Sequence, residues 1–275
     1  MKNLENKVIK DFGHEWKYFD HKKRDNKIQK ESFNQYFSNF PFQLLKKNSV
    51  GFDAGCGTGR WAKFILEKDL KLNCIEPSEA IYIAKKNLKS FQKVKFINKT
   101  IKNCNLKPNS HHFGYCLGVL HHTNDVKKNL LKCNQILKKD APFLLYLYYN
   151  FENKTKIFKF IWWISNLARI FISKAPFVLK KKICFIIAIL IYLPLARLNL
   201  FLDKLVLTRK IDLPLNYYKD KDFYIMYNDA LDRFGTKIEK RFSKEEIRKL
   251  LIETGFKNIK FNNSMPYWTV LSYKK

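Results

Sequence analysis

Hydrophobic positions between residues 49 and 150 fall into short apolar runs that alternate with amphipathic segments. In the segment 125–138, Val126, Leu130, Cys133 and Leu137 lie on one face at helical spacing, whereas the runs between such segments are short enough to be buried strands. Short connections between alternating strands and helices predict right-handed βαβ units on a parallel sheet. The expected strands are 49–54, 72–76, 94–98, 113–117 and 143–149, and the expected helices are 60–68, 78–88 and 125–138, with Ser78 as a candidate cap of the second helix.

The last segment, 243–275, adds one helix and two strands. Ser243 and Glu246 have the spacing of a capping box, and Gly255 is placed to end the helix. Strands are expected over 256–261 and 268–273, which brings the total to seven.

The remaining segments flank or interrupt this pattern. Residues 1–49 are expected to form an N-terminal helical cap, with helices over 26–39 and 41–47. The core then comprises 50–150 together with 243–275. Residues 151–242 break the alternation and are expected to form a helical insertion and a lid over the functional site.

The charge of the chain leaves two interpretations open. Lysine and arginine number 53 against 24 acidic residues, a formal net charge of +29. An anionic partner would explain this excess, but so would AT-rich codon usage, because the chain is also rich in Asn, Ile and Phe. A hydrophobic fraction of 46% excludes disorder as the main state.

A glycine-rich turn after the first expected strand is the sharpest motif. Gly55, Gly57 and Gly59 lie between a strand and a helix, where glycines let the backbone approach a ligand with its amide groups pointing toward it. Glu76 ends the next strand, where a carboxylate can accept both hydroxyls of a ribose. A tight turn without a ligand is the alternative.

The spacing of this motif separates two classes of cofactor. Dinucleotide-binding loops follow the pattern GxGxxG, whereas this loop reads GxGxG and has Asp53 beside it. A carboxylate there repels pyrophosphate but suits an amino group or a sulfonium.

Four segments resemble class I S-adenosylmethionine-dependent methyltransferases, in the subgroup related to ubiquinone-biosynthesis methyltransferases. Asp-Ala-Gly-Cys-Gly-Thr-Gly (53–59) is similar to their first motif, and Cys-Ile-Glu-Pro-Ser (74–78) to the acidic end of their second strand. The segments 113–125 and 135–146 resemble the fourth strand and the following helix, turn and strand. The resemblance covers about 50–150, with 243–275 as the usual closing elements.

The resemblance implies a doubly wound, Rossmann-like α/β fold whose seven-stranded sheet is mostly parallel with an antiparallel last strand, plus the inserted apolar helical segment. It implies S-adenosyl-L-methionine as cofactor, with Asp53 near the amino group, Glu76 on the ribose and Thr100 and Ile101 beside the adenine. The residues implied to line the rest of the cofactor site are Gly55, Cys56, Gly57, Gly59, Cys116, Leu117 and Gly118.

Candidates for the chemistry are fewer. His121 and His122 follow the fourth strand, where they could act as a base or only orient the loop. On the acceptor side, Tyr149, Asp229, Asp232 and Arg233 are candidate contacts, although packing and internal salt bridges would explain them equally well. The histidine pairs lack a third ligand at metal spacing, so no metal site is expected.

The insertion is apolar and basic. Residues 154–210 contain 12 lysines or arginines and one acid, and the longest uncharged run, 183–196, is shorter than a spanning helix requires and contains Pro194. We expect 155–207 to contact a membrane surface, with a packed hairpin or a dimer interface as alternatives. A nucleic-acid groove is not favoured, because aliphatic side chains separate the basic ones.

The sequence therefore predicts a methyltransferase for a small-molecule, saccharide or lipid-linked acceptor. An RNA-modifying methyltransferase and a non-catalytic module that binds S-adenosylmethionine are the alternatives. Six cysteines without a CxxC pair, and an N-terminus without an apolar signal, favour the cytoplasm, with peripheral attachment to the inner membrane face. The oligomeric state cannot be predicted.

Overall fold

The computed structural model describes residues 2–19, 26–204, 214–264 and 266–275, and it contains two compact units. Residues 1–152 and 238–275 form the first, the sheet unit, and residues 153–237 form the second, the helical unit. The expected function of the insertion as a lid stays a prediction.

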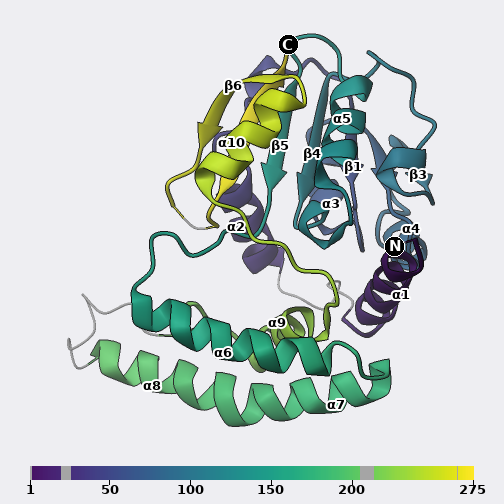
Figure 1. Cartoon of the computed structure of the whole chain (residues 1–275). Coiled ribbons are helices and arrows are strands. Elements are labelled where there is room, and N and C mark those ends of the chain that lie inside the picture. Colours follow the sequence, from purple (N-terminus) through teal and green to yellow (C-terminus); the bar gives the residue numbers. More distant parts are fainter. Residues whose placement is uncertain (1, 20–25, 205–213, 265) are drawn as a thin grey trace. The chain divides into compact units, whose positions relative to one another are not determined.

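The sheet unit contains a seven-stranded sheet in the order β3-β2-β1-β4-β5-β7-β6 (Figure 1). All neighbours are parallel except those of β7, which runs antiparallel to both β5 and β6. The predicted doubly wound fold with a reversed last strand is thus confirmed. The strands are β1 Val50–Ala54, β2 Lys71–Ile75, β3 Val94–Ile97, β4 Phe113–Leu117, β5 Pro142–Tyr146, β6 Phe256–Phe261 and β7 Thr269–Lys274.

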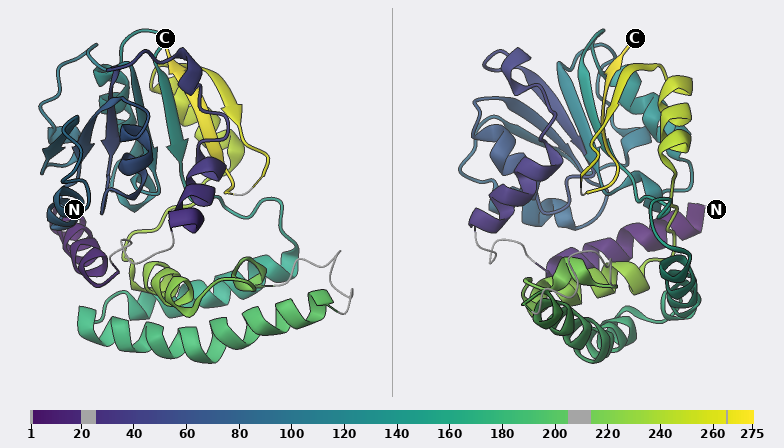
Figure 2. Two further views of the ribbon diagram at one scale, coloured as in Figure 1. Left: turned by 180° about the vertical axis from the view of Figure 1, so that it is seen from behind. Right: turned by 90° about the vertical axis from the view of Figure 1, so that its left-hand side faces the viewer.

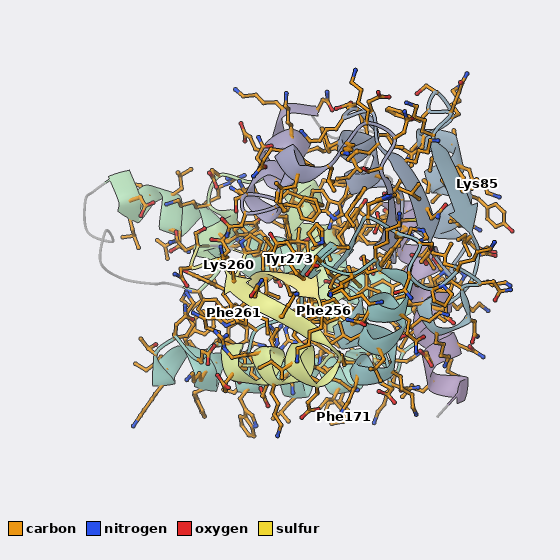
Figure 3. All side chains as sticks on the ribbon, turned by 90° about the horizontal axis from the view of Figure 1, so that it is seen from above. Lys85, Phe171, Phe256, Lys260, Phe261 and Tyr273 are labelled. Atoms are coloured by element: carbon orange, nitrogen blue, oxygen red, sulfur yellow. The ribbon has the colours of Figure 1, made fainter. Side chains whose placement is uncertain are left out.

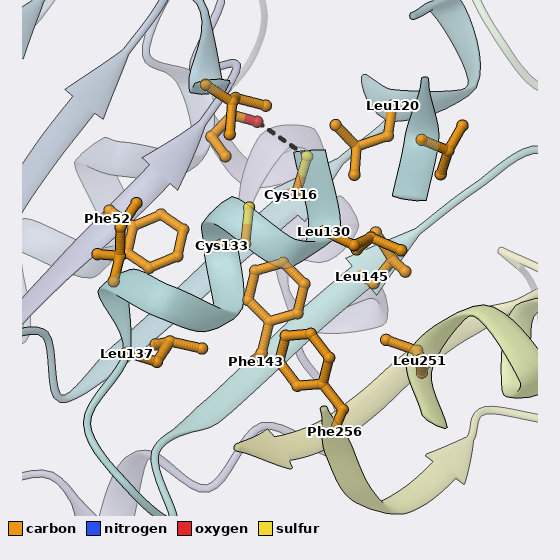
Figure 4. Packing of buried hydrophobic residues seen from close by; sticks show 14 of the residues in the cluster. Phe52, Cys116, Leu120, Leu130, Cys133, Leu137, Phe143, Leu145, Leu251 and Phe256 are labelled. Carbon is orange, nitrogen blue, oxygen red and sulfur yellow. Dashed lines mark hydrogen bonds between the residues drawn. The ribbon is translucent and has the colours of Figure 1, made fainter. Parts of the chain in front are cut away.

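Both faces of the sheet are buried, which is why the strands read as continuous apolar runs. One face packs against α5 (Val126–Ile136) and α10 (Lys244–Glu253), and the other against α2 (Asn26–Tyr36), α3 (Arg60–Leu66) and α4 (Ala80–Asn87), as the right-hand view of Figure 2 shows. On the α5 side, the rings of Phe143 and Phe256 stack at 5.1 Å, and Cys116 Sγ donates to the Ala54 carbonyl at 3.0 Å (Figure 4).

The edge of the sheet is a two-stranded antiparallel ribbon. β6 and β7 carry the labelled side chains Phe256, Lys260, Phe261 and Tyr273 (Figure 3). β7 also pairs with β5, from Pro142 opposite Tyr273 to Tyr146 opposite Thr269, and so fixes this ribbon to the parallel part of the sheet.

Local capping explains where the helices of the sheet unit begin. Asp125 accepts the amide of Lys128 at the start of α5, and Ser243 and Glu246 form the predicted capping box at the start of α10. Gly255 follows α10 with φ +86°, as a C-terminal glycine should. Ser78 was expected to cap α4, but that helix begins at Ala80 with Glu79 as its cap residue; Ser78 instead accepts the Ala80 amide within the preceding turn.

The N-terminal region differs from the prediction. Residues 2–18 form a 17-residue helix, α1 (Lys2–Tyr18), which the sequence analysis did not place. The expected helix 26–39 is present as α2, but the expected helix 41–47 is only a 3-10 turn, Phe42–Leu44. Pro41 before the turn and the extended backbone at Leu45 after it stop the helix from growing.

The helical unit contains α6 (Lys156–Ile172), α7 (Phe177–Ile187), α8 (Leu193–Lys204) and α9 (Phe223–Gly235) (Figure 1). A π-helical turn, Ala188–Tyr192, joins α7 to α8, so that one continuous helix runs from Phe177 to the end of α8. Pro194, near the start of α8, does not break this helix. The wider π turn accommodates the missing amide hydrogen of proline.

One helix in the described part of the chain, Phe177–Asp203, is long and apolar enough to cross a membrane. It has 27 residues and a window of mean hydropathy 2.2, of which 28% is buried. Length and composition alone do not separate a spanning helix from one that lies along a surface, so the positions of its charges must decide.

Candidate functional site

The glycine loop connects the carboxyl end of β1 to the start of α3. Gly55, Gly57 and Gly59 all have positive φ, at +86°, +52° and +80°. This left-handed conformation is costly for residues with a Cβ atom, so the glycines are required by the backbone itself. A Cβ at Gly55 would lie 2.5 Å from Val119, and one at Gly59 would lie 2.8 Å from Leu88.

The amide groups of the loop do not face outward as expected. The amides of Gly55 and Cys56 both donate to the Ile75 carbonyl, at 2.8 and 3.1 Å, and the Gly59 amide donates to Cys56. The Gly57 amide donates to Glu76. These four donors are consumed within the protein, so the loop does not offer them to a phosphate. This arrangement fits the sequence argument against a pyrophosphate ligand.

Glu76 follows β2 and is held by two backbone amides. Its Oε2 accepts from Gly57 at 3.1 Å, and its Oε1 accepts from Ser78 at 2.9 Å. Burial raises the pKa of the carboxyl group, and the bonds from Ser78 and Gly57 oppose that rise. Each oxygen keeps a second lone pair, so an oriented carboxylate remains able to accept both hydroxyls of a diol.

Asp53 is the buried acid of the site. It lies beside Tyr115 in the register of β1 and β4, only 1% exposed, and its Oδ2 has no hydrogen-bond partner among the described residues. Burial raises the pKa of Asp53 to about 8, although the Tyr115 hydroxyl and the Arg60 guanidinium partly oppose the rise. A buried carboxyl group with an unpaired oxygen is costly unless a ligand supplies the partner, ideally a cationic one.

The carboxyl ends of β3 and β4 lie along the same edge of the sheet as Asp53 and Glu76, which lie at the carboxyl ends of β1 and β2. Thr100 and Ile101 follow β3, and the buried Thr100 Oγ1 also has no partner among the described residues. Leu117 ends β4, and Gly118 follows with φ +77°. A Cβ atom at Gly118 would meet nothing within 4 Å, so open space adjoins the backbone at this point.

The histidine pair lies in the turn after β4 and is buried. The His122 ring donates from Nδ1 to the Ile238 carbonyl at 2.7 Å, which fixes the orientation of the ring. The His121 ring stacks on Tyr148 with centroids 3.8 Å apart, and neither of its nitrogens has a partner among the described residues. Burial lowers the pKa of His121 well below its usual value, so the ring is neutral near pH 7.

Helix α1 covers part of this edge, which the sequence analysis missed. Its Trp16 lies over the loop, with the indole nitrogen 3.7 Å from the Cβ position of Gly57, and Phe12 contacts the His122 ring at 5.0 Å. Lys17 pairs with Glu79 at 2.5 Å. The spacing of Val8, Phe12 and Trp16 by four was the available signal for this helix.

The predicted acceptor-side residues fall in both units. Tyr149, in the sheet unit, pairs with Phe242 and packs near Trp268 at 6.3 Å. Asp229, Asp232 and Arg233 lie on α9 of the helical unit, where they make contacts within that unit. The eleven predicted cofactor residues and both histidines, by contrast, gather at the carboxyl ends of β1 to β4. The roles of all these residues stay predictions.

We expect Gly55→Ala to lower the free energy of unfolding by about 2–4 kcal/mol, because it adds left-handed backbone strain to a clash with Val119. Gly57→Ala is the matched variant, with a similar backbone but no contact under 3.7 Å, and should cost only about 1 kcal/mol. Urea denaturation measures both. Equal losses would mean that the Val119 side chain moves aside, and that its closeness to Gly55 does not add to the loss of stability.

These features define what the edge can bind. It offers a buried carboxyl group for a cation, a carboxylate held for a diol and open space beside Gly118. No group of three or more histidine, cysteine, aspartate or glutamate side chains within the described residues could hold a metal ion. A nucleoside that carries a positive charge fits this set.

The comparisons with known proteins agree with this chemistry. The family described as "Methyltransferase domain" matches residues 52–145. No curated protein matches the chain. Among solved structures, a SAM-dependent methyltransferase from Thermotoga maritima is similar at 15% identity, with a TM-score of 0.52 over 96% of this chain and 99% of its own. Phosphoethanolamine N-methyltransferase 2 of Haemonchus contortus, in complex with S-adenosylhomocysteine, has 13% identity and a TM-score of 0.50, over 86% of this chain and 39% of its own.

Proposed function

The chain carries a methyltransferase domain of the class I S-adenosylmethionine-dependent family, and on this premise we propose that it methylates a lipid-linked acceptor in the cytoplasm, at the inner face of a membrane. The observation that best supports methyl transfer is that two acidic residues, Asp53 and Glu76, lie at the carboxyl ends of neighbouring strands. One is a buried carboxyl group with an unsatisfied oxygen, and the other is oriented with free lone pairs.

Each residue of the site would bind a different part of the cofactor. Asp53 would attract the amino group of the cofactor, Glu76 would hold its ribose, and Thr100 and Ile101 would flank its adenine. When bound, the cofactor supplies a methyl group on a sulfonium, which is already activated for in-line displacement. The chain therefore contributes mainly alignment and the exclusion of water.

A proton acceptor is needed only where the acceptor atom carries a proton. His122 is the candidate for this role, because the bond from its Nδ1 to the Ile238 carbonyl holds the ring in one orientation. His121 is neutral and buried, so it can accept a hydrogen bond but holds a proton poorly. Its stacking on Tyr148 suggests an orienting role.

The apolar, basic composition of the insertion and its point of connection in the chain favour a lipid-linked acceptor over a soluble one. The chain leaves the sheet unit just after β5 and returns at Ile238. The two connections meet there, because the Phe242 amide donates to the Tyr148 carbonyl at 2.8 Å and the Asn150 amide donates back to Phe242 at 3.0 Å. The chain that leads into the helical unit thus starts from the carboxyl end of β5, and the cofactor residues lie at the carboxyl ends of the strands beside it. Six buried cysteines without a disulfide support a reducing compartment.

The acceptor class can be tested with cofactor that carries a radiolabelled methyl group. We expect label to pass to the lipid extract of cells and not to their water-soluble metabolites or bulk RNA. Label in RNA would favour the RNA-modifying alternative, for which the net charge of +29 is the argument. Tight binding of the cofactor without transfer to any fraction would indicate a binding module.

A further inference from the structure

The outer surface of the helical unit is unusually apolar. Eighteen of the 25 exposed large apolar side chains in the described part of the chain lie on α6 or on the continuous helix from α7 to α8. Soluble proteins rarely expose a contiguous apolar face of this extent. Its most exposed members are Ile157, Phe171, Leu190 and Val178, all above 60%.

The interior of the same unit contains polar and charged side chains among its apolar ones. Arg169 and Lys180 are buried, and they donate to the carbonyl groups of Thr236 and Gly235 at the end of α9, at 2.9 and 3.0 Å. These bonds satisfy carbonyls that a helix end leaves without partners, and they place positive charge at the negative end of its dipole. The side chain of Asn199 is buried as well and donates to two carbonyls.

One side of the long helix is buried, and a lysine lies on this buried side. Positions spaced by four are buried, namely Lys180, Cys184, Ala188, Tyr192 and Ala196. The opposite side carries exposed Phe185, Ile186, Ile189, Leu190 and Leu198. A helix of a soluble protein buries its apolar face and exposes its charges, whereas here a lysine lies inside and aliphatic side chains lie outside. Polar groups inside and apolar groups outside are typical of protein in contact with lipid.

The exposed charges on these helices are all basic. Lys156, Lys159, Lys174, Lys182 and Arg197 are exposed near the ends of the helices, and the acid of this segment, Asp203, is paired with Lys219. A second copy of the chain would bring two such positive rims together, which disfavours a dimer through this face. Anionic lipid headgroups complement the rim.

We infer that the outer face of α6 and of the α7–α8 helix inserts into one leaflet of an anionic lipid bilayer and lies along its surface. The uncharged part of the long helix, 183–196, is 14 residues, or about 21 Å, against the ~30 Å that a span requires. Lys182 at one end can reach the headgroups, and the residues between it and Arg197 can contact acyl chains. Arg197 at the other end is exposed and donates to the carbonyl groups of Lys219 and Lys221. The inference depends on contacts within the helical unit and not on the reaction.

The test uses the full chain with vesicles of phosphatidylcholine containing 30% phosphatidylglycerol. We expect wild type to float with these vesicles, and the double variant Ile189→Glu/Leu190→Glu to partition at least tenfold less. The matched control is Leu44→Glu/Ile252→Glu, which charges two exposed apolar positions of the sheet unit and should float like wild type. Equal flotation of all three proteins, or none of wild type, would overturn the inference.

A second measurement distinguishes insertion from electrostatic attachment. Trp163 is 52% exposed on this face, whereas Trp61 is buried in the sheet unit. Acyl chains brominated near the interface should quench wild-type fluorescence, and Trp163→Phe should remove at least half of that quenching while Trp61→Phe leaves it. Unchanged quenching in Trp163→Phe would contradict insertion. Calorimetry with S-adenosylmethionine on each variant reports the proposed function separately, because none of the substituted residues belongs to the cofactor site.

Discussion

We expect Glu76→Ala to lower the affinity for S-adenosylmethionine by roughly 100- to 1,000-fold. The carboxylate can give a ribose two charge-assisted hydrogen bonds, and their loss corresponds to about 3–4 kcal/mol of binding free energy. The substitution also removes the acceptor of the Gly57 amide, which helps to hold the loop in its binding conformation. Titration calorimetry measures the affinity, and circular dichroism shows whether the fold persists.

Two further variants keep this expectation testable if the alanine variant folds poorly. Glu76→Gln retains the shape but cannot accept from both Gly57 and Ser78, so an intermediate loss of about 10- to 50-fold is expected. Glu67→Gln removes an exposed carboxylate at the C-cap of α3 and should bind like wild type. Full affinity in both folded Glu76 variants would refute the assignment of the ribose to this residue.

The fold of residues 50–150 and 243–275 was predictable because each of its signals is local. Buried parallel strands give continuous apolar runs, and Asp125, Ser243 and Gly255 mark helix ends by capping chemistry alone. The position of Glu76 after the second strand follows from the same rules, because carboxyl ends of parallel strands meet at one edge. All seven strands lie within three residues of their predicted ends.

The parts that were missed depend on tertiary contacts. Helix α1 is polar over most of its length, and it is the contacts of Phe12 and Trp16 with the site that give it a place. The outward-facing loop amides expected from the glycine motif are instead bonded to Ile75 and Glu76, since the loop closes on the end of β2. A sequence motif indicates the turn but not the partners of its donors.

The burial of a lysine in the helical unit could not have been predicted from the sequence. Lys180 is one of three successive lysines, and nothing local distinguishes it from Lys181 and Lys182. Its burial depends on the end of α9, more than 50 residues away, where the Gly235 carbonyl accepts a hydrogen bond from the ammonium group. One short basic run therefore contributes both a buried lysine, which bonds to the end of α9, and the exposed Lys182.

Asp53 has opposite effects on stability and on binding. In the unfolded chain its carboxyl group ionises near 3.8, whereas in the folded protein burial raises the pKa to about 8. Between these values the folded state holds a proton that the unfolded state has released. The carboxyl group therefore destabilises the free protein increasingly as pH rises from about 4 to 8, and the cost is complete above the folded-state pKa. A cationic ligand reverses the balance, because it favours the ionised form.

Asp53→Asn should accordingly become more stable than wild type as pH increases, while it binds S-adenosylmethionine more weakly. Between pH 6 and 8 the stability advantage should grow by roughly 2 kcal/mol, as urea denaturation at each pH would measure. At pH 8 the affinity should fall by about 10- to 100-fold, because a neutral amide no longer attracts the cation. Asp69→Asn is the control: Lys93 lowers the pKa of Asp69, so its contribution changes only in acid and stays constant over this window. A pH-independent advantage for Asp53→Asn would mean that Asp53 is already charged in the free protein, and that the site is built around a standing negative charge.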